Sequence, residues 1–502
     1  MPRSLILHLH LHQPPREDPW LGELPHDRAA APDHDATAQL ERTCYRPLAA
    51  ARVLDGDGRI ARVASTLAWT SLAVAPPLIA WMERHAPETY AAVLAADRAS
   101  GRRLGGAAFG NAIAHPYHHA VLPLLSRRDK LTEVRWGVRD FERRFGREPV
   151  GFWLPETAAD DETLEVLVAC GLRFTIVAPH QLAAPDGGAV YLGHGHPLAW
   201  RGAGGRTLAL VPYDGALSAG VAFGALLRDG RAWARRVAGE AVDDGEANER
   251  GERSAAEAAA DAAADAAAKA AAEAAEEEAR MPRLVTMATS AETFGHHHAF
   301  GEMALAAMLA AVTARPDVRV ENASSWLARH APDGALAEAV LVGPSSWSCP
   351  HGVERWRTDC GCRQDSTTHQ RWRAPLRAAL DGLAAACDAR LAREGPDLLG
   401  GDPWAARDAY GGDATGDDPT RAVPPSRDPV WARELLEMSR ESLRMRGSDA
   451  WFGDDVGDEA VRLALRSAAR VVTLLGPAAP AHERALVDAL GAAPGNEAAI
   501  PT

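Results

Sequence analysis

The 502-residue chain has few cysteines, no long apolar runs and no excess of positive charge. Six cysteines are too few for a scaffold built from disulfides. No uninterrupted apolar run reaches the ~18 residues of a membrane-spanning helix, and no small-residue cleavage site follows the first apolar stretch. We therefore expect a cytoplasmic protein without a membrane partner.

Positive charge is also scarce. The formal net charge is −14, and residues 243–280 alone contribute −8 of it through twelve acidic and four basic residues. A nucleic-acid-binding protein needs a basic surface, so we expect no nucleic-acid partner. Apolar residues make up 47% of the chain and charged residues 24%, which is typical of a globular protein with a sizeable core.

The hydrophobic periodicity indicates strands that alternate with helices. Residues 5–12 alternate strictly, with four leucines on one face and Ile6, His8, His10 and His12 on the other. Further buried-type strands are expected at 150–154, 174–178, 208–211 and 284–289, and the clearest helices at 129–145 and 161–170. This order predicts an α/β protein with a parallel sheet, and we favour a barrel with active residues at the carboxyl ends of its strands.

The chain is expected to contain two parts. Residues 1–330 form the predicted barrel, which an Ala/Glu-rich, low-complexity insertion interrupts at about 244–280. Residues 331–502 read as mostly helical, with helices at 372–393, 429–444 and 458–475 and a long loop at 397–426. A cysteine cluster lies at 349–362, at the start of this second part.

Chemistry-bearing residues gather where three of the predicted strands end. The first segment contains His10 and His12, the second runs from Trp153 to Glu156, and the third is residues 288–298, with Ser290, Glu292 and three consecutive histidines. A carboxylate at the carboxyl end of a barrel strand, beside an aromatic ring, is typical of a glycosidase nucleophile and its sugar-stacking platform. Taken singly, each segment also fits a plain strand end, a helix N-terminus or a metal site.

Together the three segments resemble glycoside hydrolase family 57. The resemblance covers roughly residues 1–365 through His12-Gln13-Pro14, the strand that bears Glu156 and the Glu292-Thr293-Phe294-Gly295-His296 segment. It extends more weakly to residues 448–452. It implies a (β/α)7 barrel followed by helices that acts on α-glucans by a retaining mechanism without a metal. Hydrolysis, branching and glucan transfer all occur among such relatives.

The resemblance also assigns roles to single residues. Glu156 falls on the nucleophile, and the positions expected to bind substrate are His10, His12, Trp153, Glu292, His296 and Trp451. The family's general acid is an aspartate two residues before the glutamate of the third segment, and here that position is Ser290.

Serine at position 290 leaves the two-carboxylate mechanism incomplete, because a hydroxyl cannot protonate a leaving oxygen as a carboxylic acid does. Two interpretations follow. The chain is either an active α-glucan enzyme with a relocated acid, for which Glu292 is the first candidate, or a catalytically impaired, sugar-binding relative.

Two metal hypotheses complete the list. Cys349, His351, Cys360 and Cys362 carry donor types suited to a structural zinc, although reduced thiols are the simpler interpretation and no cofactor is required for the glycosidase chemistry. A third class of function is a metal-dependent hydrolase, such as a polysaccharide deacetylase, that uses His10, His12 and residues 296–298. The sequence offers no acidic ligand directly beside the first histidine pair.

Overall fold

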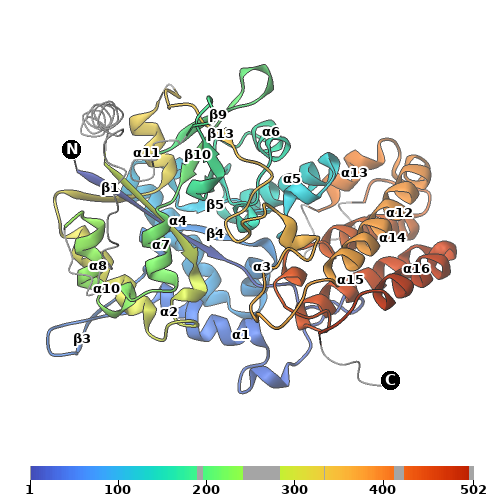
Figure 1. Cartoon of the computed structure of the whole chain (residues 1–502), viewed down its shortest axis with the longest axis horizontal. Coiled ribbons are helices and arrows are strands. Elements are labelled where there is room, and N and C mark those ends of the chain that lie inside the picture. The colour runs from blue at the N-terminus through green and yellow to red at the C-terminus, as the bar shows by residue number, and fades with distance from the viewer. Residues whose placement is uncertain (1, 189–195, 241–282, 333, 412–422, 497–502) are drawn as a thin grey trace, which may run out of the picture.

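A computed structural model describes residues 2–188, 196–240, 283–332, 334–411 and 423–496. Parallel strands form the centre of the larger part of the molecule, and helices of the C-terminal third lie beside it, at the right of Figure 1. The predicted insertion at 244–280 lies outside the described residues, and the predicted division at residue 330 stays a prediction.

The parallel strands follow one another in chain order around the centre. They are β1 (Arg3–Leu11), β4 (Ser71–Val74), β5 (Ala112–Ile113), β6 (Gly151–Phe152), β7 (Phe174–Val177), β10 (Thr207–Pro212) and β11 (Leu284–Ser290). The last of these pairs in parallel with the first, with His8 opposite Ala288 and His10 opposite Ser290.

Two junctions of this ring depend on few hydrogen bonds. Between β5 and β6, the amide of Ala114 donates to Gly151 O at 3.0 Å, and the amide of Trp153 donates to Ala114 O at 2.8 Å. Between β10 and β11, the amide of Asp214 donates to Thr286 O at 2.7 Å. The strand order is that of a (β/α)7-type barrel, so the predicted α/β class with a helical C-terminal region is confirmed.

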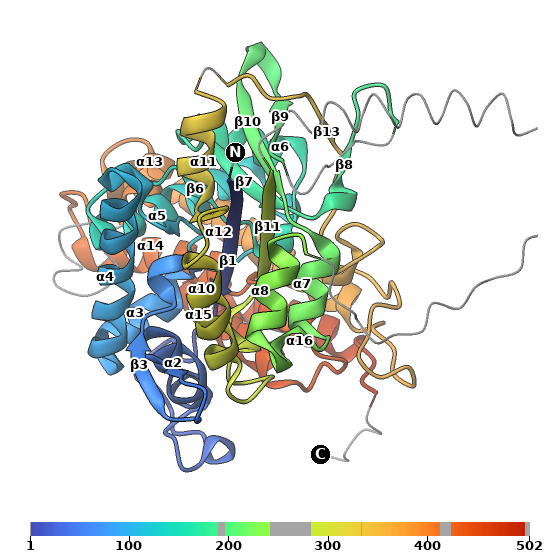
Figure 2. The ribbon, with the colours of Figure 1, turned by 90° about the vertical axis from the view of Figure 1, so that its left-hand side faces the viewer.

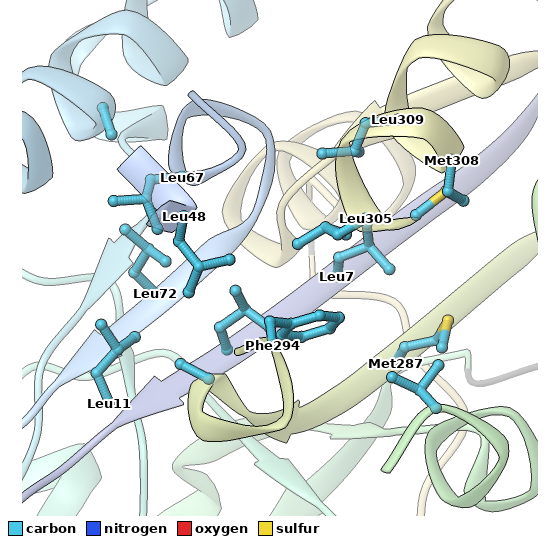
Figure 3. Packing of buried hydrophobic residues seen from close by; sticks show 14 of the residues in the cluster. Leu7, Leu11, Leu48, Leu67, Leu72, Met287, Phe294, Leu305, Met308 and Leu309 are labelled. Atoms are coloured by element: carbon cyan, nitrogen blue, oxygen red, sulfur yellow. The ribbon is translucent and has the colours of Figure 1, made fainter. Parts of the chain in front are cut away.

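The alternation along β1 explains why this strand is central. Its leucines face outward and pack with residues of the surrounding helices, as Figure 3 shows for Leu7 beside Leu305. Ile6, on the opposite face, belongs to a separate core inside the ring. Since side chains alternate along a strand, the histidines at positions 8, 10 and 12 share the inner face with Ile6.

Helices and short strands surround the ring, and Figure 2 shows α7, α8 and α10 outside β1 and β11. The helices are α1 (Ala36–Leu40), α2 (Arg46–Ala49), α3 (Pro76–His85), α4 (Pro87–Leu104), α5 (Arg127–Phe145), α6 (Asp161–Ala169), α7 (Gly215–Ala222), α8 (Gly230–Val237), α10 (Gly301–Thr313) and α11 (Ala323–His330). The additional strands are β2 (Ala51–Leu54), β3 (Ile60–Ala64), β8 (Leu182–Ala183), β9 (Leu198–Arg201), β12 (Val318–Glu321) and β13 (Val340–Leu341).

The C-terminal helices pack around a hydrophobic core of their own, which includes Trp356, Trp372 and Trp451. They are α12 (Arg373–Leu399), α13 (Pro403–Tyr410), α14 (Pro429–Arg444), α15 (Glu459–Leu474) and α16 (Ala479–Gly491). Among the described residues, no helix is both long enough and apolar enough to cross a membrane.

One expectation about this region is wrong. The predicted loop at 397–426 contains α13, whose start is capped by Asp402 at the amide of Trp404 and has proline at its first position. Arg407 docks the helix through a buried ion pair with Asp129, 2.8 Å apart. The helix was missed because polar anchors, rather than an apolar stripe, hold it in place.

Candidate active site

Glu156 lies shortly after β6, in a short turn that places its backbone in the left-handed region, with φ of 59°. The side chain is 8% exposed, and its Oε2 accepts a hydrogen bond from Ser348 Oγ at 2.6 Å. Burial raises the pKa of the Glu156 carboxyl, and the bond from Ser348 opposes that rise because it favours the ionised form. A strained, buried carboxylate at a strand end is typical of a functional residue.

Four residues that are not glycine have a positive φ in the described part of the chain: His119, Glu156, Thr157 and Phe300. Three of them lie at this site. Such a conformation costs free energy for a residue with a side chain, and the surrounding packing must enforce it. The clustering therefore shows that, at this edge of the barrel, tertiary packing enforces backbone conformations that these residues would not adopt on their own.

Uncharged imidazoles lie beside Glu156. The ring of Trp153 stacks on His8 and His10, with centroids 4.7 and 5.3 Å away. Burial and neighbouring imidazoles lower the pKa of His8 to about 3 and that of His10 to about 4. Trp153 is 4% exposed, so it supports these imidazoles and does not offer an open face to a sugar.

A second histidine pair comes from the loop after β5. His119 stacks on His12 with a centroid distance of 3.5 Å and an angle of 10° between the rings, and it also stacks on His115 at 4.9 Å. Burial holds the pKa of His115 and His119 well below the usual value for histidine. We refer to His8, His10, His12, His115 and His119 as the histidine cluster.

The C-terminal region contributes to the same cluster. Asp449 Oδ1 accepts a hydrogen bond of 2.6 Å from His12 Nε2, and the Oγ of Ser448 lies 2.6 Å from His119 Nδ1. These contacts join residues more than 300 positions apart in the chain. The site is therefore built jointly by the barrel strands and the short turn at 448–451.

The loop that carries His115 and His119 is held by α5. Glu133 accepts hydrogen bonds from the amide of His118 at 2.8 Å and from its ring at 2.7 Å. Gly137 faces this loop, and a Cβ there would lie 1.8 Å from His115 O. Glycine at position 137 is thus required for the loop to approach the helix.

Several buried ring nitrogens of the site have no hydrogen-bond partner within the described part of the protein. They are His8 Nε2, His12 Nδ1, His115 Nε2, His119 Nε2 and Trp153 Nε1. Buried polar atoms normally find partners, so these nitrogens offer donors and acceptors to a bound ligand. A polyhydroxylated molecule such as a sugar supplies matching groups.

The third predicted segment lies on the strand next to β1. Ser290 ends β11 beside His10, and its Oγ accepts a hydrogen bond from the amide of Glu292 at 3.2 Å. Glu292 itself accepts a bond of 2.7 Å from the side chain of Gln13. The Gln13 of the His-Gln-Pro segment therefore anchors Glu292, and Ser290 is the residue at the barrel's inner strand end.

Two predicted residues lie elsewhere. His296 is exposed, and its ring lies 5.0 Å from that of His297. Trp451 is fully buried in the core of the C-terminal helices and stacks on Trp372 at 6.0 Å. Within the turn at 448–451, the carboxylate of Asp449 points to the site and the indole of Trp451 points into the helical core. Asp449, and not the predicted Trp451, is therefore the residue of this turn at the site.

The structure adds residues that the sequence analysis did not select. Tyr213 follows β10 directly, and burial together with the nearby Glu156 carboxylate raises the pKa of its hydroxyl to about 12. Trp347 donates its amide to Glu156 O at 3.0 Å and is 43% exposed. The stretch His115-Pro116-Tyr117-His118-His119 was itself a signal, because its density of imidazoles is high.

The four predicted metal ligands come together on the loop that covers Glu156. The ligand atoms of Cys349, His351, Cys360 and Cys362 all lie within 4.8 Å of one another. His12, His119 and Asp449 form a second group that meets the same distance limit. The metal-dependent hydrolase hypothesis predicted His10, His12 and residues 296–298 as ligands. The structure instead groups His12 with His119, and Asp449 is the acidic residue that the sequence did not indicate beside the histidine pair.

The fold and the site together define a (β/α)7-type barrel protein with a buried glutamate among uncharged imidazoles at the strand ends. The sequence model of glycosyl hydrolase family 57 matches residues 102–337, the part of the chain that carries Glu156 and Ser290. A second model, a domain of unknown function termed DUF3536, matches residues 368–502. A search among curated proteins finds no match.

Solved structures share the fold at low sequence identity. An exo-type maltose-forming amylase from Pyrococcus sp. ST04 is 12% identical over 97% of this chain and 83% of its own, with a TM-score of 0.65. An α-amylase from Thermotoga maritima is 15% identical over 99% and 98%, with a TM-score of 0.55. A branching enzyme from Pyrococcus horikoshii is 16% identical over 98% and 94%, with a TM-score of 0.53.

Proposed function

We propose that the chain is a carbohydrate-active enzyme of the retaining glycoside hydrolase type that acts on α-glucans, by hydrolysis or glucan transfer, with Glu156 as the nucleophile. The observation that carries the proposal is the setting of Glu156. Its carboxylate is buried at a strand end, on a strained backbone, beside unpartnered imidazole nitrogens. The amylases and the branching enzyme that share the fold support α-glucan as the substrate class.

The surroundings of Glu156 fit the chemistry of a nucleophile. Ser348 donates to the carboxylate and so favours the ionised form that attacks the anomeric carbon. The uncharged imidazoles supply hydrogen bonds to sugar hydroxyls without adding a positive charge that would oppose an oxocarbenium-like transition state. The exposed ring of Trp347, next to Ser348, is the aromatic face on which a sugar can stack.

Two carboxylates, Glu292 and Asp449, are candidates for the general acid. Ser290 occupies the expected position, and Glu292 is engaged by Gln13. Asp449 is a further carboxylate close enough to Glu156 to raise the pKa of that residue. If neither carboxylate delivers a proton, the chain is a sugar-binding relative with impaired catalysis, which is the second candidate function that Ser290 favours.

An activated substrate tests the role of Glu156 without relying on an acid. With an α-glucosyl fluoride, the carboxylate oxygen of Glu156 bonds to the anomeric carbon and fluoride leaves, so little protonation is needed. In retaining enzymes the acid of the first step is the base of the second, so Ser290 should also slow the release of the covalent intermediate. We expect peptide mass mapping to find the glycosyl label on Glu156.

The control is Glu156→Gln, which keeps the size of the side chain and removes the charged oxygen. It should bind malto-oligosaccharides and carry no label. A label on another carboxylate, or fluoride release by Glu156→Gln at the parent rate, contradicts the assignment. Binding of malto-oligosaccharides without any label supports the sugar-binding alternative instead.

A further inference from the structure

The loop that covers Glu156 carries a compact group of sulfur and nitrogen atoms. Cys349, His351, Cys360 and Cys362, which we call the cysteine cluster, lie on this loop between the barrel and α12. Cys349 is buried, Cys360 and Cys362 are partly exposed, and His351 is exposed. None of these side chains has a role in the chemistry proposed for Glu156.

The distances within the cysteine cluster are those of ligands around one tetrahedral ion. Cys349 Sγ lies 4.0 Å from Cys360 Sγ and 3.7 Å from Cys362 Sγ, and Cys362 Sγ lies 3.7 Å from His351 Nδ1. Zinc at ~2.3 Å from sulfur and ~2.0 Å from nitrogen separates two sulfurs by ~3.8 Å and a sulfur from a nitrogen by ~3.5 Å. A disulfide requires ~2.05 Å, so these sulfurs are not bonded pairs.

The local sequence explains how a Cys-x-Cys pair can provide two ligands. Gly361, between Cys360 and Cys362, has φ of +84°, a left-handed conformation that turns the chain sharply and suits glycine. Gly352 also has φ of +84°, and a Cβ there would lie 2.5 Å from Pro344 O. One glycine therefore follows the Cys349 and His351 pair, and another separates Cys360 from Cys362. In each case the turn requires glycine.

We propose that Cys349, His351, Cys360 and Cys362 bind one structural zinc ion. Three thiolates and a neutral imidazole leave a net charge of −1 on the zinc-bound cluster. A buried guanidinium lies beside it, because Arg373 Nη1 donates to Cys362 O at 3.3 Å. The zinc-bound cluster supplies the negative charge that such a buried cation needs.

The ion would fix the loop that contacts Glu156. This loop is attached to the barrel by hydrogen bonds between Ser345 and Ala159 at 2.9 and 3.1 Å. Its next residues give Glu156 two contacts, the amide of Trp347 and the hydroxyl of Ser348, and Cys349 follows immediately. Zinc therefore holds in place the segment that positions Ser348, and the zinc site itself stands whether or not the chain acts on glycans.

Metal content of the purified full-length chain tests the proposal. Protein prepared with reductant and without chelator should contain about one equivalent of zinc by elemental analysis. Cys360→Ser and Cys362→Ser should each lose it, whereas Cys170→Ser, which changes a partly buried cysteine outside the cluster, should retain it. A parent chain without zinc that also fails to take up added zinc overturns the proposal, as does full zinc content in both cluster variants.

Cobalt provides a readout on the unmodified chain if the variants fold poorly. Replacement of zinc by Co²⁺ should give the absorption of thiolate-to-cobalt charge transfer together with visible bands of a tetrahedral ion. Octahedral cobalt without thiolate bands overturns the assigned ligand set. A disulfide within the cluster, found by mass spectrometry of protein kept under cytosol-like reducing conditions, overturns it as well.

Hydrogen exchange tests the link between the zinc and the loop. Removal of zinc by a chelator should speed exchange in the peptide that contains the amide of Trp347, because its bond to Glu156 O depends on the loop position. The control is the peptide of α10, on the far side of the barrel from this loop. Unchanged exchange at Trp347 after zinc removal contradicts the positioning role.

Discussion

The histidine cluster comes from the strand ends of the barrel and the cysteine cluster from the loop that contacts Glu156, and each contains residue types that bind metals. In the cysteine cluster, three sulfurs and one nitrogen stand apart at tetrahedral distances. In the histidine cluster, His12 and His119 lie face to face, 3.5 Å apart and nearly parallel. Because the lone pair of an imidazole nitrogen lies in the ring plane, an ion shared by both rings would be ~1.7 Å out of each plane, given a bond of about 2.1 Å.

This difference shows that proximity of ligand types does not define a metal site. The orientation of the donor orbitals decides, and it favours a metal at the cysteine cluster and hydrogen bonding to a ligand at the histidine cluster. The unpartnered nitrogens of the second cluster agree with this division. Four predictions test it, beginning with the largest expected effect.

Ser290→Asp should restore the carboxylate that the histidine side of the site lacks. A positioned general acid contributes about a hundredfold to ten-thousandfold, so we expect the rate on an unactivated α-glucan to rise by ~100-fold or more. Affinity for the ligand should change little, because the acid acts on the leaving oxygen. Product analysis on an α-glucan panel gives both values.

A parent chain that is already fast, and slower after Ser290→Asp, would show that the acid lies elsewhere. Asp449→Asn and Glu292→Gln then distinguish the two remaining carboxylates. If both the parent and Ser290→Asp are inactive but bind malto-oligosaccharides, the chain is a sugar-binding relative. If neither form binds, the α-glucan assignment is wrong.

Ser348→Ala tests the contact that the cysteine side makes with Glu156. Loss of a hydrogen bond to a charged group costs about 1.5 kcal/mol or more, which corresponds to roughly tenfold in kcat/KM. The same bond lowers the pKa of Glu156, so its removal should move the acid limb of the pH–rate profile to higher pH. The rate must fall as that carboxylate is protonated, because only its ionised form is a nucleophile.

The matched control is Ser346→Ala, which removes a neighbouring hydroxyl that donates to Gly352 O. It should leave the acid limb in place even if the loop becomes less stable. An acid limb that moves equally in both variants, or in neither, contradicts the direct role of Ser348.

Much of the barrel was predictable because its longer strands are strongly patterned. The alternation of residues 5–12 correctly predicted β1 and its two faces. The helix predicted at 129–145 is α5, which ends at Phe145 as expected but begins earlier, at Arg127 after the Ser126 cap. β4 and β5 were missed, since Ser71–Val74 and Ala112–Ile113 contain fewer aromatic and β-branched residues than an equally short strand such as β7. β4 pairs with β1, and β5 pairs with β4, so the sheet supplies what their own sequence does not.

The candidate site was predictable on the barrel side and hidden on the other. Residues that end strands, such as Glu156, can be found because parallel strands bring their carboxyl ends together. Asp449 contacts His12 across 437 positions of the chain, and no local pattern indicates which residue of the 448–452 segment faces inward. The short turn at 449–451 buries Trp451 and directs Asp449 to the site.

The titration of the inner histidines is expected to affect stability rather than rate. The pKa of His8 and of His10 is about 3 and about 4 in the folded chain, against a usual 6.5. Between pH 6.5 and 4 the unfolded chain therefore binds more protons, and the free energy of unfolding falls as the pH is lowered, by about 1.4 kcal/mol per pH unit for each such histidine. Above pH 6.5 these residues contribute no slope.

Urea unfolding of the parent and of His10→Gln over this pH range measures the contribution of one residue. The slope of the free energy of unfolding against pH should be smaller in the variant by the equivalent of one proton. The difference between the two slopes removes the contributions of titratable groups that both chains share. His26→Gln, which changes an exposed histidine, is the control and should keep the slope of the parent. Equal slopes for His10→Gln and the parent would mean that His10 is charged in the folded protein.

The smallest effect is expected from His119→Ala on metal content. His12, His119 and Asp449 lie as close together as the residues of the cysteine cluster, but the two rings are stacked and His12 already donates to Asp449. Removal of His119 should therefore leave the zinc content of the chain unchanged, whereas Cys362→Ser should abolish it. Elemental analysis of the two variants prepared in parallel makes the comparison. Loss of an equivalent in His119→Ala would require the rings to reorient around an ion, and it would favour the metal-dependent hydrolase over the glycosidase, since a metal there would lie beside Glu156.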